Sequence, residues 1–188
     1  HLAALTSRTP HWPDGTRAVS ELRLSLKVRP AGMLAGLRGT RTVHLDIVDY
    51  PGEWLLDLGL MDKTYDAWSA AALARLSSWN AGDYAAAMQT IDPTAKLIET
   101  EAQTLARAYT AALHAARLAG AYDLTPGRFL LPGELEGSPA LTFAPLPPGD
   151  APRGSLRREM ERRFEAYKSQ VVRPFFRDHF ARLDRQGG

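Results

Sequence analysis

The sequence contains no cysteine, which excludes disulfide bonds, thiolate metal sites, iron–sulfur clusters and cysteine nucleophiles. It also has no apolar run near the length of about 18 residues that a membrane-spanning helix needs. An excess of charge of one sign is absent too, because 23 Lys and Arg stand against 21 Asp and Glu. These absences give no reason to expect nucleic-acid binding, and the lack of thiols fits the reducing cytoplasm, where we expect the protein.

What is present is the composition of a globular domain. The 188 residues are 45% hydrophobic and 23% charged, so the chain is long enough to bury a sizeable core. The basic residues are 19 Arg and only 4 Lys, which together with abundant Ala indicates a GC-rich coding bias. The composition therefore describes a fold class more than a function.

Two segments alternate apolar and polar residues with a period of two, the pattern of a half-buried strand. Residues 19–29 place Leu22, Leu24 and Leu26 on one face, and residues 41–48 repeat the pattern. A Gly- and Pro-containing loop lies between them, so we expect an antiparallel hairpin.

Beyond Gly52 the apolar period becomes 3.6, which predicts helices. The expected helices cover 61–79, 81–91, a segment that begins at Asp92 as N-cap and ends near Gly120, and a segment that begins at Ser155 as N-cap and kinks or restarts at Pro174. Seven of the 13 prolines lie within 123–154, which predicts an irregular connection with short extended pieces at 128–131 and 140–143.

The stretch most informative about chemistry is Asp49-Tyr50-Pro51-Gly52, at the end of the second strand. An acidic residue there can hold Mg²⁺ through water, and a glycine three residues later lets a backbone N–H approach a γ-phosphate. This Asp-x-x-Gly pattern is typical of GTPase switch regions. An ordinary turn after a strand would match as well, and that alternative stays open.

Two further residues extend this hypothesis. Thr16, in the loop before the first strand, is a candidate Mg²⁺ ligand through its hydroxyl, or else a turn or cap residue. Glu53 follows Gly52, where a carboxylate could orient water, or else serves as an acid in the first turn of a helix. Trp54 is expected to pack in the core, and Asp57 and Asp62 to cap helices. The five histidines show no metal-ligand spacing, and Arg157, Arg158, Arg162 and Arg163 are expected on a solvated helix face.

The chain resembles the YcjX-like family of bacterial P-loop GTPases. The resemblance rests on Trp12–Arg17, on Asp46–Leu58 and on Val171–Gln186, and so covers nearly the whole sequence. It implies an α/β P-loop domain with a large helical insertion, binding of GTP or GDP with Mg²⁺, and a role in bacterial stress and the phage-shock response. Within these 188 residues we expect mainly helix and one antiparallel hairpin.

The sequence departs from that family pattern because it has no Gly-Lys pair for a P-loop and no Asn-Lys-x-Asp motif for guanine. We therefore expect an interior piece of a longer protein, inactive alone. The expected division is 1–55 for the switch loop, hairpin and Asp-x-x-Gly, 56–122 for the helical insertion, 123–154 for the connection and 155–188 for a helix returning to the P-loop domain. The alternatives are an ATP-specific enzyme, or a helical module that binds a protein partner and carries a vestigial nucleotide motif.

Overall fold

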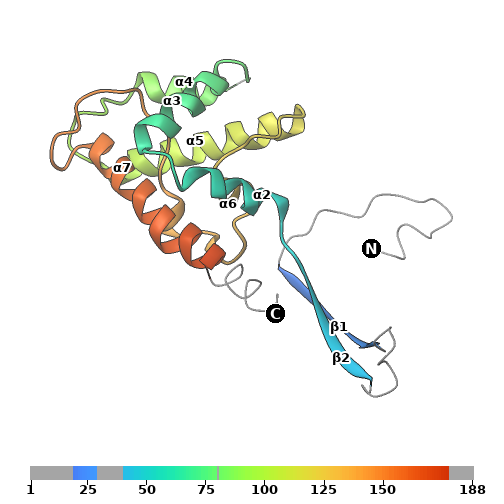
Figure 1. Cartoon of the computed structure of the whole chain (residues 1–188). Coiled ribbons are helices and arrows are strands. Elements are labelled where there is room, and N and C mark those ends of the chain that lie inside the picture. Colours follow the sequence, from blue (N-terminus) through green and yellow to red (C-terminus); the bar gives the residue numbers. More distant parts are fainter. Residues whose placement is uncertain (1–18, 29–39, 80, 178–188) are drawn as a thin grey trace. The chain divides into compact units, whose positions relative to one another are not determined.

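The computed structural model describes residues 19–28, 40–79 and 81–177, which belong to two compact units, residues 1–52 and residues 53–188 (Figure 1). The described residues are mainly helical with one antiparallel hairpin, which confirms the expected secondary-structure class. Among them, no helix is both long enough and apolar enough to cross a membrane.

The hairpin of the first unit consists of β1 (Ser20–Val28) and β2 (Arg41–Asp49). Its register pairs Leu22 with Ile47, Leu24 with Leu45 and Leu26 with Val43, so apolar side chains meet on one face. On the polar face His44 Nδ1 lies 3.0 Å from the Ser25 hydroxyl, which makes this histidine a cross-strand structural partner.

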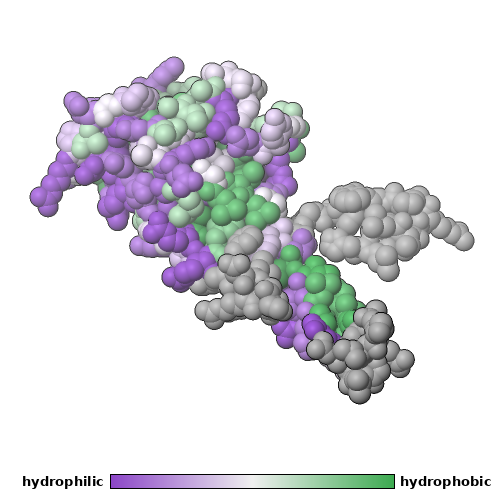
Figure 2. All heavy atoms as spheres, viewed as in Figure 1, coloured by the Kyte–Doolittle hydropathy of each residue, from purple (hydrophilic) through white to green (hydrophobic). Residues whose placement is uncertain are grey.

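The apolar face of the hairpin stays exposed, and Figure 2 shows it as a continuous hydrophobic strip. Its exposed members are Leu22, Leu24, Leu26, Val28, Leu45 and Ile47. A two-stranded hairpin is at best marginally stable in water, because one ladder leaves most of its apolar surface wet. The hairpin therefore exposes an apolar face of the kind that is normally packed against other parts of a protein.

The second unit is built from short and long helices. They are α2 (Gly52–Leu55), which starts at the last residue of the first unit, the 3₁₀ helix η1 (Leu56–Leu60), α3 (Tyr65–Leu76), α4 (Gly82–Gln89), α5 (Glu99–Leu118), α6 (Gly127–Leu130), the 3₁₀ helices η2 (Gly133–Leu135) and η3 (Pro139–Leu141), α7 (Leu156–Tyr167) and a π-helix (Lys168–Val172) that continues as a helical turn over 173–177. Helix α4 packs on α5, and α3 packs on α7 (Figure 1).

An aromatic cluster fills the centre of this unit. The fully buried ring of Trp68 on α3 stacks on Phe164 of α7, with centroids 4.9 Å apart. Tyr109 of α5 and Phe143 of the connection meet Trp68 edge-on, at 5.9 and 5.6 Å. Three helices and the connection thus share one core, which holds them as a single body.

The Pro-rich connection contributes to this core. Phe143, Ala144 and Leu146 are fully buried, and helix side chains bind the surrounding carbonyl groups. The Tyr65 hydroxyl donates to Ala144 O at 2.8 Å, and the Ser69 hydroxyl donates to Leu146 O at 2.6 Å. An irregular backbone can be buried here because side chains satisfy its polar groups.

Three local predictions were wrong. Helix α5 begins at Glu99, because the Asp92 carboxylate instead accepts from Thr94 N at 2.8 Å in a local turn. The pieces predicted as extended within the connection are helical, as α6 and η3. There the N–H groups of Leu131 and Thr142 donate to Gly127 O and Pro139 O within one turn, at 3.1 Å each. The two strands of the described residues pair with each other.

The last helical region follows the sequence more closely. The Ser155 hydroxyl accepts from Arg158 N at 3.2 Å, which confirms it as the N-cap of α7. The predicted break near Pro174 takes the form of the π-helix that precedes it. A wider helical turn accommodates the ring and the missing N–H of Pro174.

Candidate functional site

The two best-supported residues of the nucleotide motif lie at the end of β2. Asp49 is the last residue of that strand and is exposed, and Gly52 follows after a buried Pro51. Thr16, the other predicted Mg²⁺ ligand, lies outside the described residues. The structure thus places a carboxylate and a glycine at the exposed end of one strand.

Nothing in the described packing requires glycine at position 52. A Cβ built there meets no heavy atom within 4 Å, and the backbone is not in the left-handed region. The described residues also contain no group of three His, Asp or Glu side chains able to hold a metal. Mg²⁺ commonly keeps waters and takes phosphate oxygens as ligands, so one carboxylate and one hydroxyl fit such a site.

Glu53, the first residue of the second unit, is held by two parts of that unit. Its carboxylate forms an ion pair with Arg117 near the end of α5. Its carbonyl oxygen lies where Gly127, at the start of α6, has no side chain: a Cβ there would be 1.7 Å from that oxygen. The backbones of Glu53 and Gly127 therefore touch in a way that only glycine allows.

Trp54 is buried, as the sequence predicted, and it is bound on three sides. Its indole Nε1–H donates to Leu131 O at 2.7 Å, and the Arg128 guanidinium lies 3.4 Å from the ring centroid. Phe175 meets the indole edge-on at 5.4 Å. The buried Arg128 also pairs with Glu134 at 3.1 Å, so this cation–π contact has a fixed geometry.

Asp57 is buried within η1, where the sequence predicted a helix cap. Its two carboxylate oxygens accept hydrogen bonds from Gly127 N at 2.7 Å and from the Tyr167 hydroxyl at 2.5 Å. The cap prediction was wrong because these partners lie 70 and 110 residues away, beyond the reach of local pattern analysis. The prediction for Asp62 was wrong as well, since Thr64 caps α3.

The environment of Asp57 raises its pKa to about 6, from an ordinary value of 3.8. The principal cause is burial, which disfavours the charged carboxylate. The hydrogen bonds from Tyr167 and Gly127, and the positive charge of Arg128, act in the opposite direction. We call residues 53–57, with this carboxylate at the end, the anchored segment.

The arginines of α7 do not form one solvated face. Arg157 is buried and its guanidinium pairs with Asp66 and binds the Pro147 carbonyl, while Arg163 is bound by Glu99 at 2.6 Å and Glu159 at 2.9 Å. Only Arg158 and Arg162 of the four match the prediction. A helix period of 3.6 turns 157 and 163 toward neighbouring elements, which the charge pattern alone concealed.

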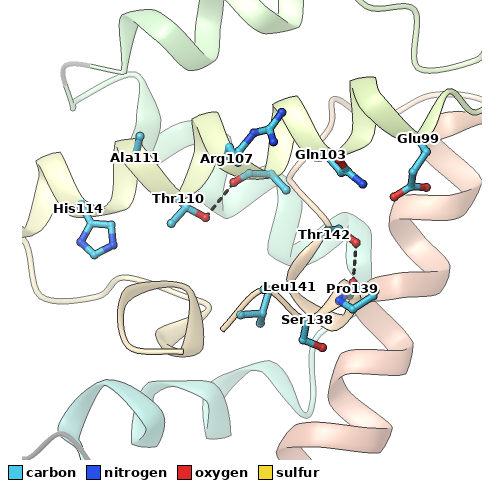
Figure 3. A pocket seen from close by; sticks show the side chains of 12 residues that line it. Glu99, Gln103, Arg107, Thr110, Ala111, His114, Ser138, Pro139, Leu141 and Thr142 are labelled. Carbon is cyan, nitrogen blue, oxygen red and sulfur yellow. Dashed lines mark hydrogen bonds between the residues drawn. The ribbon is translucent and has the colours of Figure 1, made fainter. Parts of the chain in front are cut away.

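A cavity of about 620 Å³ lies between α5 and the turn around η3. Figure 3 shows Gln103, Arg107 and His114 along α5, with Ser138 and Leu141 on the other side. Two hydroxyl groups at its rim donate to backbone carbonyls, Thr110 to Ala106 O at 2.9 Å and Thr142 to Pro139 O at 2.5 Å. No sequence motif marked this cavity, and its lining joins none of the predicted nucleotide residues.

Comparison with known proteins identifies the family. Residues 1–186 match the YcjX-like family, DUF463. The chain is 40% identical to the Ras-like GTPase YcjX of Shewanella oneidensis, over 98% of this chain and 41% of that protein. It is 37% identical to the Ras-like GTPase YcjX of Escherichia coli K12, over 98% of this chain and 43% of that protein. The chain thus spans about two-fifths of the length of these relatives, and it belongs to the YcjX-like family.

Proposed function

We propose that this chain supplies the switch region and helical part of a Mg²⁺-dependent protein that binds and hydrolyses GTP. The observation that carries the proposal is Asp49-x-x-Gly52 at the exposed end of β2, with Gly52 in open space. A glycine that packing does not require is expected where a ligand must approach the backbone. The names of the relatives, both Ras-like GTPases, support the guanine nucleotide.

Each site residue has a defined task in this proposal. In the full-length protein the Asp49 carboxylate, through water, and the Thr16 hydroxyl would hold Mg²⁺, and the Gly52 N–H would donate to the γ-phosphate. When bound, Mg²⁺ neutralises charge on the phosphate oxygens during transfer. Loss of the γ-phosphate would remove the partner of the Gly52 N–H, so the position of Gly52 would depend on which nucleotide is bound.

Glu53 is the candidate for orienting the attacking water. A carboxylate near a γ-phosphate would be repelled, but its ion pair with Arg117 offsets part of that charge. Glu53 also lies in the first turn of α2, where an acid interacts favourably with the helix dipole. The variant Glu53→Gln keeps the shape of the side chain but removes its charge, so GTP hydrolysis and thermal stability are measured together. Lost hydrolysis with unchanged stability assigns the catalytic role, and lost stability with unchanged hydrolysis assigns the helix-dipole role.

The exposed apolar face of the hairpin is consistent with a larger sheet in the full-length protein. If β1 and β2 joined the sheet of an α/β P-loop domain, the helices of that domain would cover this face. By contrast, the apolar stripes of α3, α5 and α7 are buried in the unit's own core. This burial favours the switch hypothesis over a helical module that binds a protein partner through those stripes.

A titration of the full-length protein with fluorescent GTP, GDP and ATP, with and without Mg²⁺, tests the proposal. We expect saturable binding of GTP and GDP that is weaker without Mg²⁺, and weaker binding of ATP. Tighter binding of ATP than of GTP would instead assign the protein to the ATP-specific alternative. The absence of any Mg²⁺-dependent nucleotide binding would refute the proposal and favour an interaction module.

The cytoplasmic location and the link to bacterial stress belong to the same proposal and rest on the family resemblance. Both are tested in the source bacterium by following the amount of the protein, and its fractionation, before and after heat shock. We expect an increase in the soluble fraction. An unchanged amount would remove the stress role without affecting nucleotide binding.

A further inference from the structure

The anchored segment is joined to three distant parts of the helical unit. Glu53 is bound by Arg117 of α5, and Asp57 is bound by Gly127 of α6 and by Tyr167 at the end of α7. These contacts span most of the unit's sequence. The residues immediately after Gly52 are thus more firmly connected to the helices than a solvent-exposed switch loop would be.

The contact between Glu53 and Gly127 leaves little room for one residue to move without the other. It joins backbone to backbone, because the missing Cβ of Gly127 leaves the space that the Glu53 carbonyl oxygen fills. A displacement of Glu53 must therefore displace the start of α6 or break the contact. Packed contacts of this kind shift between discrete arrangements, since a close-packed interior does not deform continuously.

Asp57 extends the connection to the end of α7. Both of its oxygens are occupied, and its burial leaves no water to replace a lost partner. Directly after Tyr167 the chain changes to the π-helix Lys168–Val172. A π-helical turn has a hydrogen-bond register different from that of α7, so this is a place where the helix can shift by one register.

Beyond the π-helix, the chain returns to the anchored segment. Phe175 lies 5.4 Å from the Trp54 indole, edge to face. Lys168, the first residue of the π-helix, is held on the other side by the Lys63 carbonyl at 2.7 Å. The π-helix therefore lies between two contacts, that of Lys168 with Lys63 and that of Phe175 with Trp54. The second of these is made to the anchored segment.

We propose that the anchored segment transmits the state of the nucleotide to α7 and the π-helix, and that Tyr167 and Asp57 form the coupling contact. The inference rests on the proposed GTP switch, because the signal begins at the proposed hydrogen bond from the Gly52 N–H to the γ-phosphate. Glu53 is covalently next to Gly52, so movement of that glycine reaches the anchored segment through one peptide bond. The nucleotide would then change the conformation of the helical unit.

Hydrogen–deuterium exchange on the full-length protein tests this directly. The protein is compared with GDP and with a non-hydrolysable GTP analogue, both with Mg²⁺, at peptides covering 127–131 and 156–172. We expect the two nucleotides to change protection there by roughly 5–150-fold, the usual range of allosteric coupling. A variant that removes the coupling contact should change the ratio of the GTP-analogue and GDP affinities by up to the same factor.

The matched variants are Tyr167→Phe and Tyr109→Phe. Both remove one hydroxyl from a buried tyrosine, but Tyr109 donates to Thr125 O at 2.7 Å and not to the anchored segment. We expect Tyr167→Phe to reduce the nucleotide-dependent difference in protection and Tyr109→Phe to retain it. Asp57→Ala, which removes the carboxylate that the Tyr167 hydroxyl binds, replaces Tyr167→Phe if the latter does not fold.

Each other outcome contradicts the inference in an identifiable way. Equal protection at 156–172 with both nucleotides, while both bind with Mg²⁺, overturns the coupling and leaves the proposed function intact. An equal loss in the two tyrosine variants assigns the effect to general packing and also overturns it. A protein that binds neither nucleotide refutes the proposed function, and the coupling with it.

Discussion

The buried carboxylate of Asp57 makes a prediction that depends on pH. Its pKa is about 6 in the folded protein and 3.8 when solvated, so the folded state binds its proton more tightly. Below pH 3.8 the group is protonated in both states. As pH rises from 4 to 6 the unfolded state releases the proton first, so the free energy of unfolding falls.

The size of this effect follows from the two pKa values. A difference of about two pKa units, at 1.36 kcal/mol each, corresponds to about 3 kcal/mol lost between pH 4 and pH 7. In Asp57→Asn the amide oxygen can still accept from Gly127 N, and the amide nitrogen can donate to the Tyr167 oxygen. We therefore expect the variant to match the wild type near pH 4 and to exceed its stability by up to about 3 kcal/mol at pH 7.

Urea unfolding followed by tryptophan fluorescence, repeated from pH 4 to pH 7.5, measures this difference. The control is Asp92→Asn, because the bond from Thr94 lowers the pKa of Asp92. A lowered pKa gives stability above pH 3.8 that is lost as pH falls, so this control has the opposite sign. If the stability of Asp57→Asn runs parallel to that of the wild type, the assignment of a raised pKa to Asp57 is wrong.

Three further substitutions test separate contacts. Gly52→Ala and its control Gly59→Ala should both leave thermal stability unchanged, since neither Cβ meets an atom within 4 Å. Gly52→Ala alone should weaken binding of a GTP analogue, and unchanged binding would remove the glycine from the site. Gly127→Ala should lower the free energy of unfolding by about 1–3 kcal/mol, because its Cβ collides with the Glu53 backbone; an unchanged melting temperature would contradict that contact. Ser155→Ala should cost about 1 kcal/mol in the same thermal assay by removing the N-cap of α7, and no loss would show that the cap is replaced by water.

Patterns carried by neighbouring residues allowed the hairpin and most helices to be predicted. The alternation around Leu24 and Leu45 depends on residues two apart, and it fixed both strands and their pairing. The N-cap role of Ser155 was equally local. The Asp49-x-x-Gly52 pattern is local as well, and the family resemblance favoured its interpretation as a nucleotide switch over an ordinary turn.

The anchored segment could not be predicted in this way. Asp57 has the sequence context of a helix cap, and only the tertiary structure brings it to Tyr167 and Gly127. The start of α5 was misplaced for a related reason, because the Asp92 carboxylate bonds its own turn and not a helix. A signal did exist in Gly127, a glycine inside a segment that proved helical, but its meaning depends on a partner 74 positions earlier, Glu53.

The most direct test of the account is the Mg²⁺-dependent affinity of the full-length protein for GTP in Asp49→Ala. A residue that holds the metal through water should weaken metal-dependent binding by roughly 10–100-fold when it is removed. The matched control is Asp46→Ala, on the same strand, which loses an exposed pair with Arg23 at 2.8 Å and should bind GTP as the wild type does. Equal affinities of the two variants for GTP with Mg²⁺ would contradict the assignment of Asp49–Gly52 to a nucleotide switch.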